Sequence, residues 1–154
     1  MAESSVIPVL HNVSSVQRVV DAARLAYTLG YDVLVVTKAY GGAAQSGVPE
    51  AMRLALKAGK SLIVLPGLED AVSLLSPDEI VLVTRDYARE TLDPARLEPP
   101  SGRMMIVVSG GEPEFTAGEA RLGRPVYIEG VEGKLGALAE LSILLYAYRR
   151  VGTG

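Results

Sequence analysis

Short apolar runs rich in β-branched residues recur along the chain, and segments with helical periodicity or loop character separate them. The runs are Val6–Leu10, Asp32–Thr37, Ser61–Leu65, Ile80–Thr84, Met104–Val108 and Val126–Ile128. Runs that are apolar almost throughout are typical of strands buried on both faces of a parallel sheet. The pattern therefore predicts an α/β protein with a mainly parallel sheet and helices on both faces.

Helical spacing is clearest between Asn12 and Gly30, where apolar residues recur on one face and Gly30 provides a stop signal. Further helices are predicted at Pro49–Ala58 and Leu68–Leu75, and one or two helical turns within Asp86–Leu92. Lys38–Val48 and Asp93–Gly102 are predicted to be loops. Pro8 indicates that the first strand lies near an edge of the sheet or that Pro8 stands at the start of the strand.

The last helix, predicted at Leu135–Tyr148, is apolar nearly all round, with only Glu140 and Ser142 as polar exceptions. A helix without a polar face must be covered on more than one side. In a chain of 154 residues, we expect a second copy of the protein to supply that cover, so that Leu141 and Leu145 belong to the interface.

Composition narrows the classes of function. The chain is 49% hydrophobic and 21% charged, which is typical of one compact domain spanning residues 1–154. With no cysteine and a single histidine, His11, neither a thiolate nor a histidine-rich metal site is expected. No apolar run is long enough to span a membrane, and Met1–Ser5 does not resemble a signal sequence. We therefore expect a cytoplasmic protein that contains no metal.

Candidate chemistry gathers at the ends of the predicted strands, where α/β sheets bind ligands. His11 and Asn12 follow the first strand, Ser109–Glu112 follow Met104–Val108, and glycines recur through Glu129–Gly136. Glycines let backbone groups approach a ligand closely. Neither GxGxxG after the first strand nor GxxxxGK[ST] anywhere is present, so dinucleotides and nucleoside triphosphates are not favoured.

Three segments together resemble the motifs of SpoU-type SPOUT methyltransferases. Asn12 followed, after five intervening residues, by Arg18 resembles the first motif, IVVSGGEPEF resembles the second, and VYIEGVEGKLGALAELSILLYAYR resembles the third. The sequence departs from the family where Gly136 and Leu138 replace an asparagine and a serine, and where Ser14 replaces a glycine.

The resemblance implies an S-adenosylmethionine-dependent RNA methyltransferase, acting at a ribose 2′-oxygen of tRNA or rRNA. It also implies a C-terminal trefoil knot and a homodimer formed through the first and last helices. The alternative, consistent with Gly136 and Leu138, is a non-catalytic dimer of the same fold that binds cofactor or RNA. An unrelated flavodoxin-like module remains a third possibility.

The resemblance also assigns site residues. Arg18, Asn12 and Glu112 would act on the substrate. Backbone groups would hold the S-adenosylmethionine at Val108, Ser109, Gly110, Gly111, Ile128, Glu129, Gly130, Leu135, Gly136, Ala137 and Leu138.

Each candidate side chain also has an ordinary structural interpretation. Arg18 could pair with Asp21 on a solvated helix face, and Asn12 could cap the first helix. Glu112 could be a surface loop residue. His11 could accept a proton from a substrate or be a solvated histidine.

Overall fold

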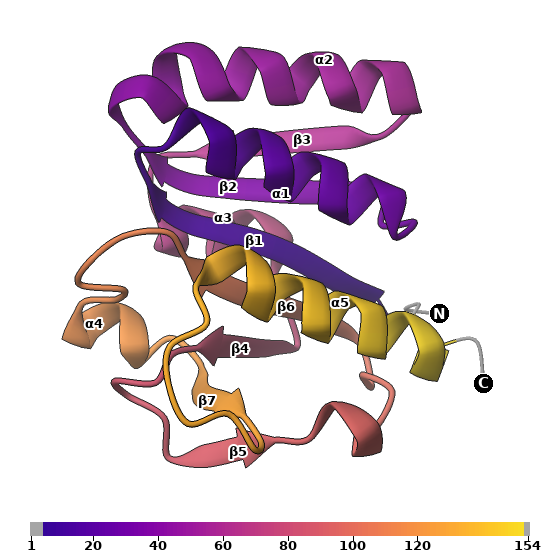
Figure 1. Ribbon diagram of the computed structural model, residues 1–154, viewed down its shortest axis with the longest axis vertical. Coiled ribbons are helices and arrows are strands. Elements are labelled where there is room, and N and C mark those ends of the chain that lie inside the picture. Colours follow the sequence, from indigo (N-terminus) through magenta and orange to yellow (C-terminus); the bar gives the residue numbers. More distant parts are fainter. Residues whose placement is uncertain (1–4, 153–154) are drawn as a thin grey trace.

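A computed structural model describes residues 5–152 of the protein (Figure 1). The prediction that Met1–Ser5 carries no signal sequence falls mainly on residues 1–4, which lie outside the described part. The elements in chain order are β1 (Ser5–Val13), α1 (Val16–Thr28), β2 (Val33–Ala39), the π-helix η1 (Ala43–Gly47), α2 (Val48–Ala58), β3 (Ser61–Leu65), α3 (Leu68–Leu75), β4 (Glu79–Val83), β5 (Glu90–Leu92), the 3₁₀ helix η2 (Pro94–Arg96), β6 (Arg103–Ser109), α4 (Ala117–Ala120), β7 (Arg124–Ile128) and α5 (Ala137–Gly152).

Within the described residues, seven strands form one sheet in the order β3-β2-β1-β6-β4-β7-β5. Every adjacent pair is parallel. Two apolar clusters lie on opposite faces of this sheet, one beneath α1, α2 and α5 and the other beneath α3 (Figure 1). The predicted α/β class is confirmed. Strands that are covered on both faces must be apolar on both sides, which explains the continuous apolar runs in the sequence.

The first strand lies in the interior of the sheet, between β2 and β6, and the prediction that it runs near an edge is wrong. It is also longer than predicted, reaching Val13. Pro8 has no backbone N–H to donate, and it is tolerated because β1 pairs only with β6 at this residue. Pairing of β1 with β2 begins at Val9.

The last helix, α5, packs against β1, β6, α1 and η2 of its own chain. Leu141 and Leu145 are fully buried there. Placing them in an interface between two copies was therefore wrong, since one chain covers them. Tyr146 is 53% exposed, so another part of α5 does remain open to a partner.

Other local predictions need correction. Asp86–Leu92 contains the short strand β5 instead of helical turns. The predicted loop Lys38–Val48 holds η1, and α4 was not predicted. None of the helices within residues 5–152 has the length and apolar character needed to cross a membrane. The trefoil knot stays a prediction.

Candidate functional site

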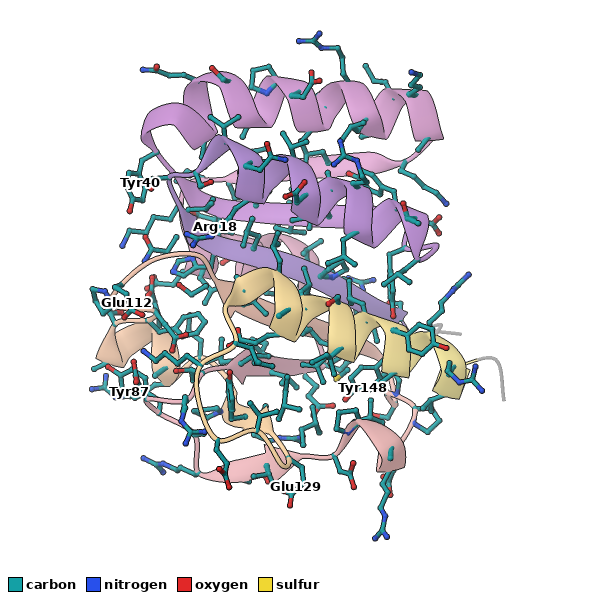
Figure 2. All side chains as sticks on the ribbon, in the orientation of Figure 1. Arg18, Tyr40, Tyr87, Glu112, Glu129 and Tyr148 are labelled. Atoms are coloured by element: carbon teal, nitrogen blue, oxygen red, sulfur yellow. The ribbon has the colours of Figure 1, made fainter. Side chains whose placement is uncertain are left out.

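Several of the predicted site residues lie at the carboxyl edge of the sheet, where the parallel strands end. Figure 2 shows Tyr40, Arg18, Glu112 and Tyr87 along this side of the molecule. The loops that follow β1, β2, β4, β6 and β7 all emerge here, because every strand runs in the same direction. This edge is where ligands of open α/β sheets bind.

Arg18 lies in the first turn of α1, whose N-cap is Ser15. The hydroxyl of Ser15 accepts a hydrogen bond from the Arg18 backbone N–H at 3.2 Å. The guanidinium of Arg18 donates to the carbonyl oxygen of Gly110 at 2.7 Å. The alternative pairing with Asp21 is not made, since Asp21 accepts from Gln17 and Arg24. Arg18 is thus fixed beside the end of β6, and one bond to a carbonyl uses only part of its donor capacity.

Asn12 does not cap α1, because it belongs to β1. Its φ of 57° places it in the left-handed region, which asparagine tolerates better than most residues. Its Nδ2 donates to the carbonyl oxygen of Pro113 at 2.9 Å. A Cβ added to Gly111 would come within 2.8 Å of that nitrogen. Asn12 therefore positions the loop after β6, and Gly111 is needed for this close approach.

His11 is fully buried, so the prediction of a solvated histidine is wrong. Its Nδ1 lies 2.8 Å from the Thr37 hydroxyl oxygen, and its ring stacks on Phe115 at 5.6 Å between centroids. Burial lowers its pKa, although the Glu119 carboxylate acts in the opposite direction. Because the ring is enclosed, His11 is a core residue in this conformation and has no access to a substrate.

Glu119, at the end of α4, faces His11 from the solvent side. Its Oε2 lies 3.1 Å from His11 Nε2, but that nitrogen makes no hydrogen bond of good geometry, so the contact is mainly electrostatic. Burial alone would raise the pKa of Glu119, but the Thr116 backbone N–H and His11 outweigh that effect and lower it. Glu119 is therefore ionised at neutral pH, and its side chain is 15% exposed.

Glu112 has 69% of its side chain exposed and lies 3.3 Å from the ammonium of Lys134. The same ammonium lies 3.0 Å from Asp86. The structure therefore supports the surface-loop interpretation of Glu112.

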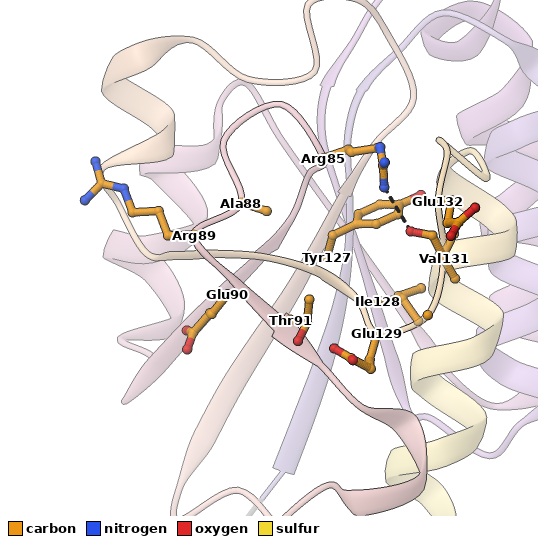
Figure 3. Close-up of a pocket in the computed structure, with 11 residues that line it drawn as sticks. Arg85, Ala88, Arg89, Glu90, Thr91, Tyr127, Ile128, Glu129, Val131 and Glu132 are labelled. Atoms are coloured by element: carbon orange, nitrogen blue, oxygen red, sulfur yellow. Dashed lines mark hydrogen bonds between the residues drawn. The ribbon is translucent and has the colours of Figure 1, made fainter.

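The predicted cofactor-binding residues differ in their exposure. Val108, Ser109, Ile128 and Ala137 are buried, whereas Glu129, Gly130, Leu135 and Gly136 are exposed. A cavity of about 480 Å³ opens beside the end of β7 (Figure 3), and of the predicted set only Ile128, Glu129 and Gly130 line it.

The remaining wall of this cavity comes from residues that the sequence analysis missed, mainly from the segment between β4 and β5. The guanidinium of Arg85 lies over the Tyr127 ring at 5.7 Å and donates to the Val131 carbonyl oxygen at 2.9 Å (Figure 3). An apolar ring with a cation and free backbone groups is the usual composition of a small-molecule site.

Two buried carboxyl groups lie behind Tyr127. The Tyr127 hydroxyl donates to Glu140 Oε2 at 2.8 Å and accepts from the Leu135 N–H at 2.8 Å. Glu140 is only 1% exposed, and its Oε1 has no hydrogen-bond partner. Glu114 accepts from the Thr84 hydroxyl at 2.8 Å. Burial raises the pKa of both carboxyl groups and that of Tyr127, to about 12.

A pH dependence of stability follows from Glu140. Because the pKa of Glu140 is raised above its ordinary 4.5 in the folded protein, the folded state holds this proton more tightly than the unfolded chain. Its contribution is most favourable below pH 4.5 and is lost as the pH rises through the raised folded value. We expect Glu140→Gln to raise the free energy of unfolding at pH 8 by roughly 1–3 kcal/mol, the cost of a buried unsatisfied group.

Urea denaturation at pH 5 and pH 8 measures this effect. Glu132→Gln is the matched control, since Glu132 is exposed at the rim of the same cavity. Equal pH dependence in Glu140→Gln and the wild type would show that Glu140 does not carry the effect.

No group of three or more His, Cys, Asp or Glu side chains that could hold a metal ion occurs within residues 5–152.

Comparison with solved structures defines the class of fold. The chain is similar to a probable methyltransferase from Bordetella pertussis, with a TM-score of 0.72, 20% identity and 96% of each chain covered. It is also similar to the SpoU methyltransferase AviRb from Streptomyces viridochromogenes in complex with AdoMet, with a TM-score of 0.75 and 14% identity over 100% of this chain and 60% of that one. The protein therefore has the α/β fold found in SpoU-type methyltransferases.

Sequence comparison defines the family. A family model described as RecB-family nuclease (DUF2122) matches residues 41–147. A protein from Aeropyrum pernix, named provisionally as a type II restriction enzyme, is 65% identical over 96% of this chain and 94% of its own length. One from Methanocaldococcus jannaschii with a similar name is 35% identical over 89% of this chain and 91% of its own. The chain belongs to the RecB-family nuclease (DUF2122) family.

These findings correct the functional prediction. The sequence motifs indicated an S-adenosylmethionine-dependent RNA methyltransferase, but the family and both relatives are nucleases by name. The comparisons therefore support an enzyme of a nuclease family. The resemblance correctly indicated an α/β fold like that of SpoU-type methyltransferases, without the knot being tested, and it failed for activity because one fold can carry unrelated functions.

Proposed function

We propose that this protein is an enzyme that hydrolyses the phosphodiester backbone of a nucleic acid bound along the carboxyl edge of the sheet. The observation that carries this proposal is membership of the nuclease family. We also propose that it works in the cytoplasm, as its composition indicates.

Arg18 and Lys38 are the side chains that we assign to the phosphate. Both are exposed, and both lie at the ends of neighbouring segments, Arg18 at the start of α1 and Lys38 near the end of β2. Lys38 has a φ of 51°, a conformation that costs an ordinary residue about 1–3 kcal/mol and is concentrated at functional sites. A fixed guanidinium and an ammonium are well suited to hold a phosphate.

Hydrolysis of a phosphodiester also needs an acceptor for the proton of the attacking water. The water oxygen forms a bond to phosphorus, the ester P–O bond breaks, and the departing oxygen takes up a proton. Glu119 is our candidate for orienting the water and accepting its proton, because it is ionised and partly exposed, and it contacts the buried His11 at the end of β1. Arg18 and Lys38 would stabilise the negative charge that develops on the phosphate oxygens.

The test is incubation of the purified protein with end-labelled DNA and RNA, single-stranded and duplex, followed by denaturing electrophoresis. Cleavage that depends on protein concentration and is weakened in Glu119→Gln supports the proposal. Intact substrates under all buffer conditions, with folded protein, would contradict it.

A second role is favoured by the cavity beside β7. The AviRb structure with this fold is a complex with AdoMet, and we propose that this cavity binds the same ligand, without assigning it a reaction. Gly130, which lines this cavity, has a φ of 82°, and a Cβ added to it would have no atom within 4 Å. The space beside Gly130 is therefore open, and the cavity volume of about 480 Å³ lies within the range of small-molecule sites. The residues present fit such a ligand.

Calorimetric titration with S-adenosylmethionine and S-adenosylhomocysteine checks this proposal, and we expect micromolar binding of both. Ala88→Trp should abolish the heat of binding, because Ala88 lines the cavity and an indole would fill it. Ala58→Trp is the control, since Ala58 is exposed at the far end of α2. If neither ligand binds to the folded wild-type protein, the proposal that this cavity binds S-adenosylmethionine is wrong.

We also propose that the protein forms a homodimer through α1 and α5, with the C-terminal segment threaded as a trefoil knot. Support comes from two apolar surface hollows on these helices. One is lined mainly by Arg24, Leu25 and Leu29 of α1, and the other by residues that include Ile143 and Tyr146 of α5.

A further inference from the structure

We infer that the carboxyl edge binds its nucleic acid as a single strand, with Tyr40 and Tyr87 stacking on unpaired bases on either side of the phosphate site at Arg18. This inference rests on the proposed function, and it goes beyond it by naming the state of the substrate.

Two exposed tyrosines occupy loops at this edge. Tyr40 follows β2 and is 49% exposed, and Tyr87 follows β4 and is 38% exposed. Figure 2 shows both on the same side of the molecule as Arg18. Single exposed aromatic side chains are ordinary, but a pair at the ligand-binding edge of one sheet needs a further explanation.

Cations accompany both tyrosines at a spacing of two residues. Lys38 precedes Tyr40, and Arg85 and Arg89 flank Tyr87; all three cations are exposed. Alternation of positive charge and aromatic rings is the composition of surfaces that bind single strands, since cations hold phosphates and rings stack on bases.

Tyr40 is held in place by its backbone. Its N–H donates to the carbonyl oxygen of Val13 at 3.0 Å, which ties the loop after β2 to the end of β1. Gly41 next to it has a φ of 56°, which turns the chain sharply towards η1. Because the loop is anchored, little backbone freedom would be lost when a base stacks on the ring.

Among the acidic groups at this edge, Glu119 is the one assigned to the attacking water, and two others share a cation. Asp86, which precedes Tyr87 in the chain, and Glu112 share the ammonium of Lys134 at 3.0 and 3.3 Å. Their charge is therefore partly neutralised. Glu129 and Glu132 are exposed beyond β7, so the favourable path for a phosphate chain runs from β2 to β4.

The dimensions of this path fit a short strand. β2 and β4 are separated by β1 and β6, which at about 4.8 Å per strand interval gives about 14 Å. That is the length of roughly four stacked nucleotides at 3.4 Å each. A duplex would keep its bases stacked inside the helix and offer no free base to either ring, whereas a single strand offers them to both.

Fluorescence anisotropy with labelled oligonucleotides tests the inference, using single-stranded DNA, single-stranded RNA of the same sequence, and duplex DNA. We expect both single strands to bind more tightly than the duplex. Tyr40→Ala should weaken single-strand binding by about 5- to 150-fold, the contribution of one stacked base. Tyr40→Phe should bind as the wild type does, because the ring and not the hydroxyl makes the contact.

Two comparisons separate stacking from a general loss of structure. Leu56→Ala removes a side chain that is 73% exposed on α2, away from this edge, and should leave binding unchanged. Tyr40→Ala should keep the salt dependence of binding, whereas Arg18→Ala should reduce the slope of log affinity against log salt by about 0.7, the value for one phosphate contact. Tyr87→Ala should act independently, so that the fold-losses of the two variants multiply.

Tighter binding of the duplex, or equal affinities of Tyr40→Ala and Leu56→Ala, would overturn the single-strand inference and leave the proposed nuclease function standing. Failure of every nucleic acid to bind folded protein would overturn both.

Discussion

Leu145→Asp is expected to yield protein that does not fold, whereas Tyr146→Asp, one position further along α5, is expected to fold normally. Leu145 is fully buried and Tyr146 is 53% exposed. Truncating a buried leucine costs about 2–5 kcal/mol, and an unpaired buried carboxylate adds several more. The sum is comparable with the roughly 5–15 kcal/mol that stabilises an ordinary domain.

Circular dichroism and thermal melting of the two variants measure this contrast. Size-exclusion chromatography with light scattering then uses Tyr146→Asp as a probe of the proposed dimer, because Tyr146 lines the hollow on α5. A dimeric wild type and a monomeric, folded Tyr146→Asp would support the interface. Soluble, cooperatively melting Leu145→Asp would contradict the burial of this helix face.

Arg18→Ala is expected to lower kcat/KM for nucleic acid cleavage by about 10- to 150-fold. The reason is the loss of a charge-assisted hydrogen bond to phosphate, which contributes about 1.5–3 kcal/mol. Arg18→Lys should retain part of the activity, since an ammonium keeps the charge but not the planar donor geometry. The measurement is initial cleavage rate against substrate concentration at constant ionic strength.

The matched control is Arg53→Ala. Arg53 is also an exposed helical arginine, 77% accessible, and its contact is with Glu50 three residues earlier on α2. We expect its removal to change cleavage by less than twofold, because exposed pairs of this kind contribute little. Similar losses in both variants would mean that Arg18 acts only through overall charge. A lower melting temperature in Arg18→Ala alone would point to its bond with Gly110.

The sequence alone specified most of the strands and the principal helices. Ser61–Leu65 and Leu68–Leu75 have the predicted bounds, and α2 differs by one residue at its start. These elements were readable because their local patterns, continuous apolar runs and helical spacing, agree with burial in a parallel sheet. The strand β5 was missed because three residues carry too little pattern to distinguish a strand from a turn.

The partners of individual side chains could not be read from the sequence. Asn12 bonds Pro113, 101 positions away, and His11 bonds Thr37, 26 positions away. Local pattern gave a helix cap for the first and a solvated ring for the second. Both interpretations failed because strand order in the sheet determines which distant residues meet, and β1 lies in the interior of the sheet, between β2 and β6.

What the sequence by itself determined is therefore the α/β class, the candidate residues that follow the strand ends and, through close relatives, the nuclease family. Only the tertiary structure decided that Arg18 is held on Gly110, that Glu140 is buried behind Tyr127, and that the cavity beside β7 is walled by Arg85. The physical reason is that secondary structure follows from interactions between near neighbours in the chain, whereas a site is assembled from loops that meet only when the sheet has formed.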